Sequence, residues 1–209
     1  MNTEAIFSVK NLSCIRNERA LFTHLSFKIN ASEALLIEGP NGSGKSSLLK
    51  ILSGLATPLS GEIFWQGQNI RDILPIFREN FHYIGHTNGI KLGLTINENL
   101  MLAAHFSEQN LPKNTAEILD ILQLTQHKNS LARQLSAGQK RRIALAKLLL
   151  FPKKLWLLDE PFTALDRQTQ TYFEAHMHHH LQKSGMIIAS SHHPMTISAT
   201  SQIVRLTSC

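Results

Sequence analysis

One short segment combines three glycines, a lysine and three serines at a spacing suited to holding phosphate groups. Residues 39–47 contain the pattern G-x-x-x-x-G-K-S. Glycines let backbone N–H groups curl around phosphate oxygens, and a helix that begins there adds the positive end of its dipole. Lys45 is predicted to bridge the β- and γ-phosphates of a nucleotide, and the Ser46 hydroxyl to bind Mg²⁺. The predicted phosphate-binding residues are Gly39, Pro40, Asn41, Gly42, Ser43, Gly44, Lys45, Ser46 and Ser47.

The context of this segment decides between two interpretations. A glycine-rich turn could match the pattern by chance. However, the segment follows an apolar run at 34–37, typical of a buried strand, and precedes a helical pattern at 46–52. A loop between a strand and a helix is the setting in which this pattern binds phosphate, so we favour the phosphate site.

Two adjacent carboxylates follow a second apolar run, Leu155–Leu158. The run predicts a buried strand, and ligands bind at the carboxyl ends of such strands in open α/β sheets. Asp159 is predicted to hold Mg²⁺, and Glu160 to polarise an attacking water as a general base. Two surface acids after a strand are the alternative, which the phosphate loop upstream disfavours.

The segment Leu135–Gln139, LSAGQ, predicts a second helix start able to bind an anion. Ser136 is a favourable N-cap residue, and the N–H groups beside Gly138 are free of helical partners. One molecule does not need two such helix ends for one triphosphate, whereas two molecules arranged head to tail do. An ordinary serine-capped helix start is the alternative, and the position shortly before Asp159 and Glu160 argues against it.

Composition and charge limit the class of protein. Of the 209 residues, 43% are hydrophobic and 17% charged, which indicates a globular chain with a sizeable core. No apolar stretch approaches the roughly 20 residues that cross a bilayer, and the N-terminus lacks a signal-like segment, so we expect a cytosolic chain. Two distant cysteines predict neither a disulfide nor a metal site. The excess of 21 Lys+Arg over 15 Asp+Glu fits nucleic acid, an anionic membrane face or simply a solvated basic surface.

The remaining pattern alternates strands with helices and predicts a mostly parallel sheet covered on both faces. Residues 95–128 are expected to be helical, with Leu102 among the inward-facing residues, and 136–150 form a strong helix that Pro152 stops. A helical insert is therefore expected between about 87 and 150. The expected strands are 6–9 and 25–29, which are antiparallel, and 34–37, 61–65, 155–158 and 186–189.

Together these motifs resemble those of ABC-transporter nucleotide-binding domains over nearly the whole chain. LSAGQ is similar to the family signature LSGGQ, and Thr163–Asp166 resembles the D-loop, whose aspartate lies across the dimer interface. His192 matches the switch histidine that contacts the γ-phosphate, with His193 a weaker candidate. The resemblance implies an α/β P-loop NTPase fold. It has a mostly parallel sheet core, an antiparallel β-subdomain and a helical subdomain at about 87–150, all in a single domain of residues 1–209.

The chain departs from the family pattern at two places. The A-loop of the family usually places an aromatic ring against adenine, but no aromatic residue lies between Phe7 and Phe22. Either the Arg16 guanidinium stacks on the base instead, or adenine is held loosely. The Q-loop glutamine would fall at His86 or Thr87. His86 is the side chain better placed to sense Mg²⁺ and the γ-phosphate.

Four features resemble those of one subfamily, the ATPase subunits of the cytochrome c maturation haem exporter. They are the histidine at this position, the stretch Trp65–Gly67, LSAGQ followed by KRR, and DEPFTALD. The resemblance implies ATP and Mg²⁺ as ligands and a homodimer of ATPase subunits. It also implies an integral-membrane permease partner at the cytoplasmic face of a bacterial inner membrane. One alternative is an ABC exporter for a lipid or peptide. Another, a nucleic-acid-associated ATPase, is suggested only by the charge, and we do not expect nucleic acid as a partner. We interpret the histidines at 176 and 178–180 as a polar helix face rather than a haem or metal site.

Overall fold

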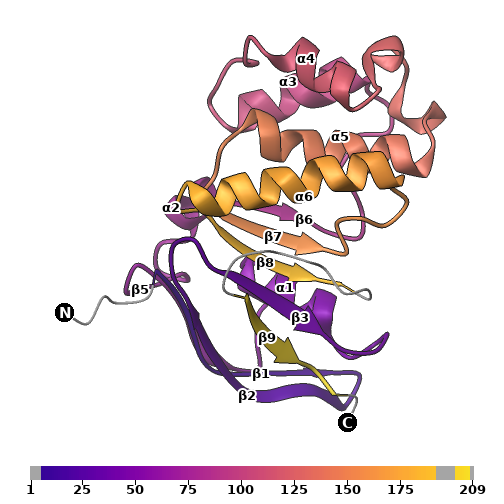
Figure 1. The fold of residues 1–209 in the computed structure, drawn as a ribbon. Helices are drawn as coiled ribbons and strands as arrows, with labels where there is room; N and C mark the ends of the chain where they lie inside the picture. The colour runs from indigo at the N-terminus through magenta and orange to yellow at the C-terminus, as the bar shows by residue number, and fades with distance from the viewer. Residues whose placement is uncertain (1–5, 192–200, 208–209) are drawn as a thin grey trace.

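The computed structural model describes residues 6–191 and 201–207, which form two sheets and the helices around them (Figure 1). One sheet has four strands in the order β2-β1-β4-β5, with antiparallel pairing. The other has five strands in the order β6-β7-β8-β3-β9, and all its pairs are parallel. The strands are β1 (Phe7–Arg16), β2 (Arg19–Ile29), β3 (Ala34–Glu38), β4 (Ser60–Trp65), β5 (Gln68–Asn69), β6 (Phe81–Ile84), β7 (Leu155–Asp159), β8 (Met186–Ser190) and β9 (Ser201–Arg205).

The parallel sheet is covered on both faces, as the continuous apolar runs predict. Successive side chains of a strand point to opposite faces. In β3, Leu35 and Ile37 join the hydrophobic cluster shared with the antiparallel sheet, while Leu36 joins the cluster under the helices. Figure 1 shows α5 and α6 above the parallel sheet, α3 and α4 beyond α5, and the antiparallel sheet at the other end of the molecule. The helices are α1 (Lys45–Leu52), α2 (Leu74–Glu79), α3 (Ile96–Phe106), α4 (Thr115–Ile121), α5 (Ala137–Leu150) and α6 (Arg167–Gln182).

The fold class and the expected strands are confirmed, although β1 and β2 extend well beyond the short segments expected. The helical interval is confirmed as two helices and a 3-10 turn, α3, α4 and Thr125–His127, with residues 107–114 connecting the helices. Leu102 is only half-buried, so the expectation that it faces inward is wrong in part. The division into a single domain with a helical subdomain at about 87–150 stays a prediction.

Two strands of the parallel sheet were not anticipated. They are β6 and β9, which occupy its two edges. An edge strand has a neighbour on one side only and is less enclosed, so it does not need a continuous apolar run. His82 interrupts the apolar residues of β6, and β9 has only two apolar residues, Ile203 and Val204, between polar ones, which is why neither strand was expected.

Candidate functional site

The residues with candidate catalytic or binding roles meet at the carboxyl-end edge of the parallel sheet, where its strands end. Ser190, the last residue of β8, pairs with Ile37 of β3 on one side and with Asp159 of β7 on the other. The phosphate loop leaves β3 at this edge. Because neighbouring strands lie about 4.8 Å apart, Asp159 is about 10 Å from the strand that delivers the loop.

The phosphate loop has a conformation that only glycine adopts readily. Gly39, Gly42 and Gly44 all have positive φ. A Cβ on Gly39 would lie 2.3 Å from the Leu206 carbonyl oxygen, and one on Gly44 would lie 3.0 Å from Leu21 Cβ. The loop is therefore enclosed between β2 and the segment after β9, and side chains at these two positions would displace it.

Lys45 bonds to its own loop in this structure. Its ammonium donates to the carbonyl oxygens of Gly39, at 2.7 Å, and Pro40, at 3.0 Å, and the side chain is 5% exposed. To contact a phosphate, this ammonium must exchange at least one of those carbonyls for a phosphate oxygen. The Ser43 hydroxyl in the same loop is buried without a hydrogen-bond partner among the described residues.

Asp159 is buried, with one carboxylate oxygen paired and the other not. Oδ1 accepts a hydrogen bond from the Ser190 hydroxyl at 2.8 Å. Within the described part of the chain, Oδ2 is buried and has no hydrogen-bond partner. Leaving a charged acceptor unsatisfied is costly, and carboxylate oxygens are ligands that Mg²⁺ prefers. The residues present therefore fit a Mg²⁺ ion held by Asp159 and by Ser46 at the start of α1.

Glu160 sits at a strained turn immediately after β7. Its φ is +47°, unusual for a residue with a side chain, and its N–H lies 3.2 Å from the Ser190 carbonyl and 3.1 Å from the Ser190 hydroxyl. The Thr163 hydroxyl donates to its Oε2 at 3.4 Å. These contacts hold Glu160 beside the end of β8, and Glu160 lines the same hollow as Asp159.

Arg141, on the second turn of α5, holds this turn in place and was not anticipated as a site residue. All five of its N–H groups have acceptors: the carbonyls of Asp159, Glu160 and Pro161, at 2.7, 2.7 and 2.9 Å, and Gly85 O and Asn88 Oδ1, at 2.8 and 3.1 Å. Its side chain is 4% exposed. Burial lowers the pKa of Arg141, while the carboxylates of Asp159 and Glu160 act to raise it. The only sequence signal was a basic run after LSAGQ, which does not distinguish Arg141 from its neighbours.

His86 lies beside the two carboxylates, whereas Thr87 does not line the same cavity. A hollow of about 170 Å³ is lined by His86, Asn88, Ala137, Arg141, Asp159, Glu160, Thr163 and Ala164. Of the two candidates for the Q-loop position, only His86 is among the described residues that line this hollow. Its role there stays a prediction.

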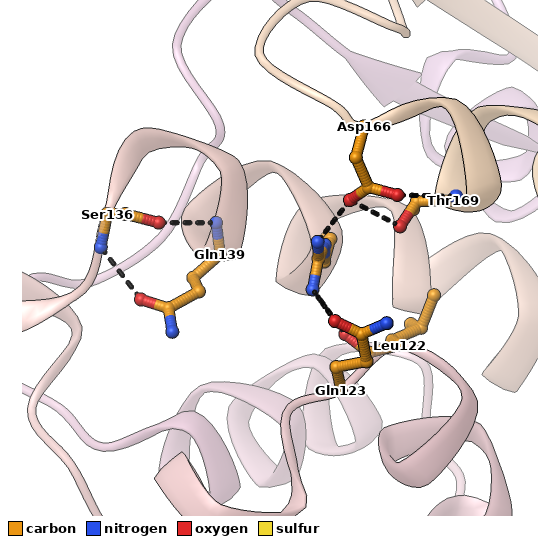
Figure 2. Close-up of polar contacts among 7 residues, drawn as sticks. Leu122, Gln123, Ser136, Gln139, Asp166 and Thr169 are labelled. Atoms are coloured by element: carbon orange, nitrogen blue, oxygen red, sulfur yellow. Dashed lines mark hydrogen bonds and ion pairs between the residues drawn. The ribbon is translucent and has the colours of Figure 1, made fainter.

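The predicted second anion site is a well-formed helix start. The Ser136 hydroxyl accepts from the Gln139 N–H at 3.1 Å, and the Gln139 side chain accepts from the Ser136 N–H at 2.9 Å (Figure 2). A Cβ on Gly138 would lie 2.7 Å from the Ala164 carbonyl oxygen. A glycine at this position is therefore explained by packing inside this chain, because the loop after β7 lies directly against it.

Asp166 is engaged within its own chain. It is the N-cap of α6, accepting from the Thr169 N–H and hydroxyl, both at 2.9 Å, and it forms an ion pair with Arg142 (Figure 2). Arg142 also donates to the Leu122 carbonyl at 3.1 Å and the Gln123 side chain at 3.3 Å. The Thr169 N–H bond, more than any other contact, lowers the pKa of Asp166 to about 2. A role for Asp166 across a dimer interface stays a prediction.

Two further expectations concern residues at the margins of this site. His192 and His193 lie outside the described residues. Arg16 ends β1, and the preceding Ile15 pairs with Ala20 and is half-exposed. Leu21 follows Ala20 and contacts the phosphate loop at Gly44, so the end of the β1–β2 hairpin lies close to that loop. How adenine is held there stays a prediction.

Comparison with known proteins agrees with this arrangement. The family model described as ABC transporter matches residues 22–163, more than half of the chain. The cytochrome c biogenesis ATP-binding export protein CcmA of Nitrosomonas europaea is 42% identical over 194 residues, covering 92% of this chain and 91% of that protein. The protein of the same description from Escherichia coli O157:H7 is 41% identical over 204 residues, covering 96% and 95%.

Solved structures share the fold. A structure described as an ATP-binding subunit of an ABC transporter superposes with a TM-score of 0.79 at 27% identity, over 90% of this chain and 80% of that chain. A dimeric ATP-binding cassette in a post-hydrolysis state, bound to ADP and phosphate, gives a TM-score of 0.78 at 24% identity, over 90% and 88%. The chain carries the phosphate loop, the carboxylates after β7 and the LSAGQ helix start. It belongs to the ABC transporter family of ATP-binding proteins and, within it, to the cytochrome c biogenesis ATP-binding export proteins of the CcmA type.

Proposed function

We propose that this chain is the ATP-hydrolysing subunit of an inner-membrane complex that exports or delivers haem for c-type cytochrome biogenesis. One observation carries the hydrolytic part of this proposal. Asp159 ends β7 and Glu160 follows it, at the edge of the sheet where the phosphate loop leaves β3, and Asp159 Oδ2 is buried without a hydrogen-bond partner among the described residues. A phosphate-binding loop beside one carboxylate able to hold Mg²⁺ and another able to act as a base suits phosphoryl transfer to water.

Binding begins at the phosphate loop in this proposal. The N–H groups of residues 39–47 surround the phosphates, and the Lys45 ammonium transfers from the Gly39 and Pro40 carbonyls to phosphate oxygens. Ser46 and Asp159 would hold Mg²⁺, which supplies positive charge against the negative charge that develops on the phosphates. Loss of Lys45 would remove a charge-assisted contact that the backbone cannot replace.

Hydrolysis needs a base and a defined position for water. Glu160 is the proposed general base, and Arg141 keeps it in position through four backbone carbonyls on both sides of the site. His86 is proposed to sense the γ-phosphate from the wall of the same hollow. His192 is proposed as the second sensor, on the strength of the resemblance alone.

We further propose that two copies work head to tail. Ser136 and Gly138 of one subunit would close over the γ-phosphate held by the other, because the Ser136 hydroxyl hydrogen remains able to donate while its oxygen caps α5. The related cassette bound to ADP and phosphate is dimeric, which supports this assembly. Asp166 would reach the interface from the cap of α6.

The membrane part of the proposal rests on the relatives. They are described as export proteins of cytochrome c biogenesis, and no helix in the described ranges is long and apolar enough to cross a bilayer. We therefore propose a peripheral position at the cytoplasmic face of a bacterial inner membrane, on an integral-membrane permease partner. The single ABC domain with a helical subdomain at about 87–150 is part of this proposal.

The hydrolytic proposal is tested with Glu160→Gln, which keeps the shape of the side chain and removes its basicity. We expect the variant to bind ATP but to turn it over at least about a hundredfold more slowly, as for loss of a general base. Glu117→Gln, at an exposed position on α4, is the matched control and should keep wild-type turnover. Normal turnover in Glu160→Gln would remove Glu160 as the base.

The pathway is tested in a strain that lacks this gene. Haem staining of cytochrome c should be lost, and wild type but not Glu160→Gln should restore it. Normal cytochrome c without the gene would contradict the haem pathway while leaving the ATPase in place, and the search would then move to a lipid or peptide substrate.

A further inference from the structure

A larger hollow lies at the amino-end edge of the parallel sheet, where the strands begin. Its walls include the residues that immediately precede three strands: Asn80 before β6, Lys154 before β7 and Gly185 before β8. These strands are parallel, so their starts share one edge and the phosphate loop lies at the other. The hollow has a volume of about 720 Å³, in the range typical of small-molecule sites. We call it the strand-entry pocket.

The last turns of α6 form one wall of this pocket. His176, His179 and His180 have the i, i+3, i+4 spacing of a single helix face, and all three line the pocket. His176, His179 and His180 were expected to belong to a polar helix face, and of these His180 also packs against an aromatic ring. Its ring stacks on Trp156 at 4.0 Å between centroids and 8° between planes.

A backbone contact also positions the His180 ring. His180 Nε2 lies 3.3 Å from the Met186 carbonyl oxygen, which accepts a hydrogen bond from the tautomer protonated at Nε2. Burial lowers the pKa of His180 to about 4, and the ring is neutral near pH 7. A Cβ on Gly185 would lie 2.3 Å from the His180 ring, so only glycine leaves room for this packing.

The pocket is predominantly basic. Among the described residues that line it, Lys153, Lys154 and Lys183 face one acidic residue, Glu79, and the Lys153 ammonium donates to the Glu79 backbone carbonyl at 2.7 Å. Lysines near helix C-termini also offset the helix dipole, so their charge alone does not identify a binding site. A second, independent observation is needed.

Trp156 supplies that observation. It is 4% exposed and lines the pocket, and its indole Nε1 is buried without a hydrogen-bond partner in the described part of the chain. Buried N–H groups of this kind are rare, because an unmade hydrogen bond is costly. A ligand that displaced the side chains covering Nε1 would bring an acceptor atom that completes this hydrogen bond.

We propose that the strand-entry pocket binds a small phosphate-bearing molecule, with Lys153, Lys154 and Lys183 around its phosphates and the Trp156 indole N–H donating to one of its acceptor atoms. Lysine binds phosphate as a point charge, as in phosphate-binding loops, and the three lysines bring positive charge to the pocket. This site is separate from the proposed ATP site and gives the chain a second place for a phosphorylated ligand.

The indole N–H signals in a ¹H–¹⁵N NMR spectrum test this proposal directly. The chain has two tryptophans, Trp65 and Trp156, and either Trp65→Phe or Trp156→Phe assigns the two signals. Pyrophosphate is the probe, and Lys45→Ala provides the background, because it weakens binding at the phosphate loop. The Trp156 signal should move on titration while the Trp65 signal stays in place.

Variants and a second anion decide the outcome. Lys154→Gln with Lys183→Gln should weaken the pyrophosphate response by about tenfold, and Lys28→Gln, exposed on β2, should leave it unchanged. No movement of the Trp156 signal at about ten millimolar pyrophosphate would overturn the proposal. So would an undiminished response in the double variant, or a response to citrate alone. Because the readout does not involve ATP, a failure here and a failure of the proposed ATPase are distinguishable.

Discussion

Arg141 gives the most direct test of how the site is held together, and we develop that test with Arg141→Met and Arg141→Lys. Methionine fills much of the same volume but makes none of the five hydrogen bonds, which leaves four backbone carbonyls and the Asn88 amide oxygen without this donor. A buried acceptor left unpaired costs about 1–3 kcal/mol, and breaking a buried charged network typically costs about 3–5 kcal/mol in total. We expect Arg141→Met to lower the free energy of unfolding by about 4 kcal/mol.

Lysine keeps the charge but has three donors on one nitrogen, and it cannot reach carbonyls on both sides of the site. We expect Arg141→Lys to lose about 2 kcal/mol of stability, roughly half the loss for methionine. Both variants should lose ATP turnover by a larger factor than ATP affinity, because the Glu160 turn is released while the phosphate loop is not contacted by Arg141.

Urea unfolding followed by circular dichroism measures the stability, and a steady-state assay measures turnover. Arg133→Met is the matched control, because Arg133 is exposed and surface substitutions usually change stability by no more than about 0.5 kcal/mol. If Arg141→Met unfolds within about 0.5 kcal/mol of wild type, the reasoning from five buried hydrogen bonds is refuted.

Three further predictions concern Asp166, Gly138 and two buried histidines. Asp166→Ala should lower the free energy of unfolding, measured in urea, by about 1–2 kcal/mol, because it removes the α6 cap and the ion pair. Asp166→Asn keeps a cap and should lower it less. Equal losses in the two variants would contradict the capping role. Gly138→Ala should reduce stability and turnover, since its Cβ would lie 2.7 Å from the Ala164 carbonyl, and an unchanged melting temperature would argue against that contact. Burial lowers the pKa values of His82 and His180 to about 4, below the usual value near 6.5, so stability is fully present above pH 6.5 and is lost as pH falls toward 4. Each of the two histidines should lower the free energy of unfolding by at most about 2 kcal/mol at pH 5, and His82→Gln should flatten the measured pH dependence. A free energy of unfolding that is equal at pH 7 and pH 5 would refute this.

Local sequence was sufficient for the elements that depend on near neighbours. The phosphate loop lies between a continuous apolar strand and a helix, and glycines at fixed spacing allow its positive φ angles, so its position and conformation follow from a few adjacent residues. The start of α5 is similar, because the capping box joins Ser136 and Gln139 only three residues apart. The apolar run of β7 likewise predicts that Asp159 and Glu160 end a buried strand.

The tertiary structure decided which of several similar residues serves the site. Arg141 and Arg142 are adjacent and chemically identical, yet the first is buried against backbone from two distant segments and the second caps the end of α4 and pairs with Asp166. His86 rather than Thr87 lines the hollow beside the carboxylates, and the edge strand β6 that leads to it lacks a continuous apolar run. Each choice depends on the direction in which a side chain leaves a helix or strand and on partners 18 to 56 residues away. Periodicity and spacing describe only near neighbours, so these long-range contacts are fixed when the sheet and helices pack together.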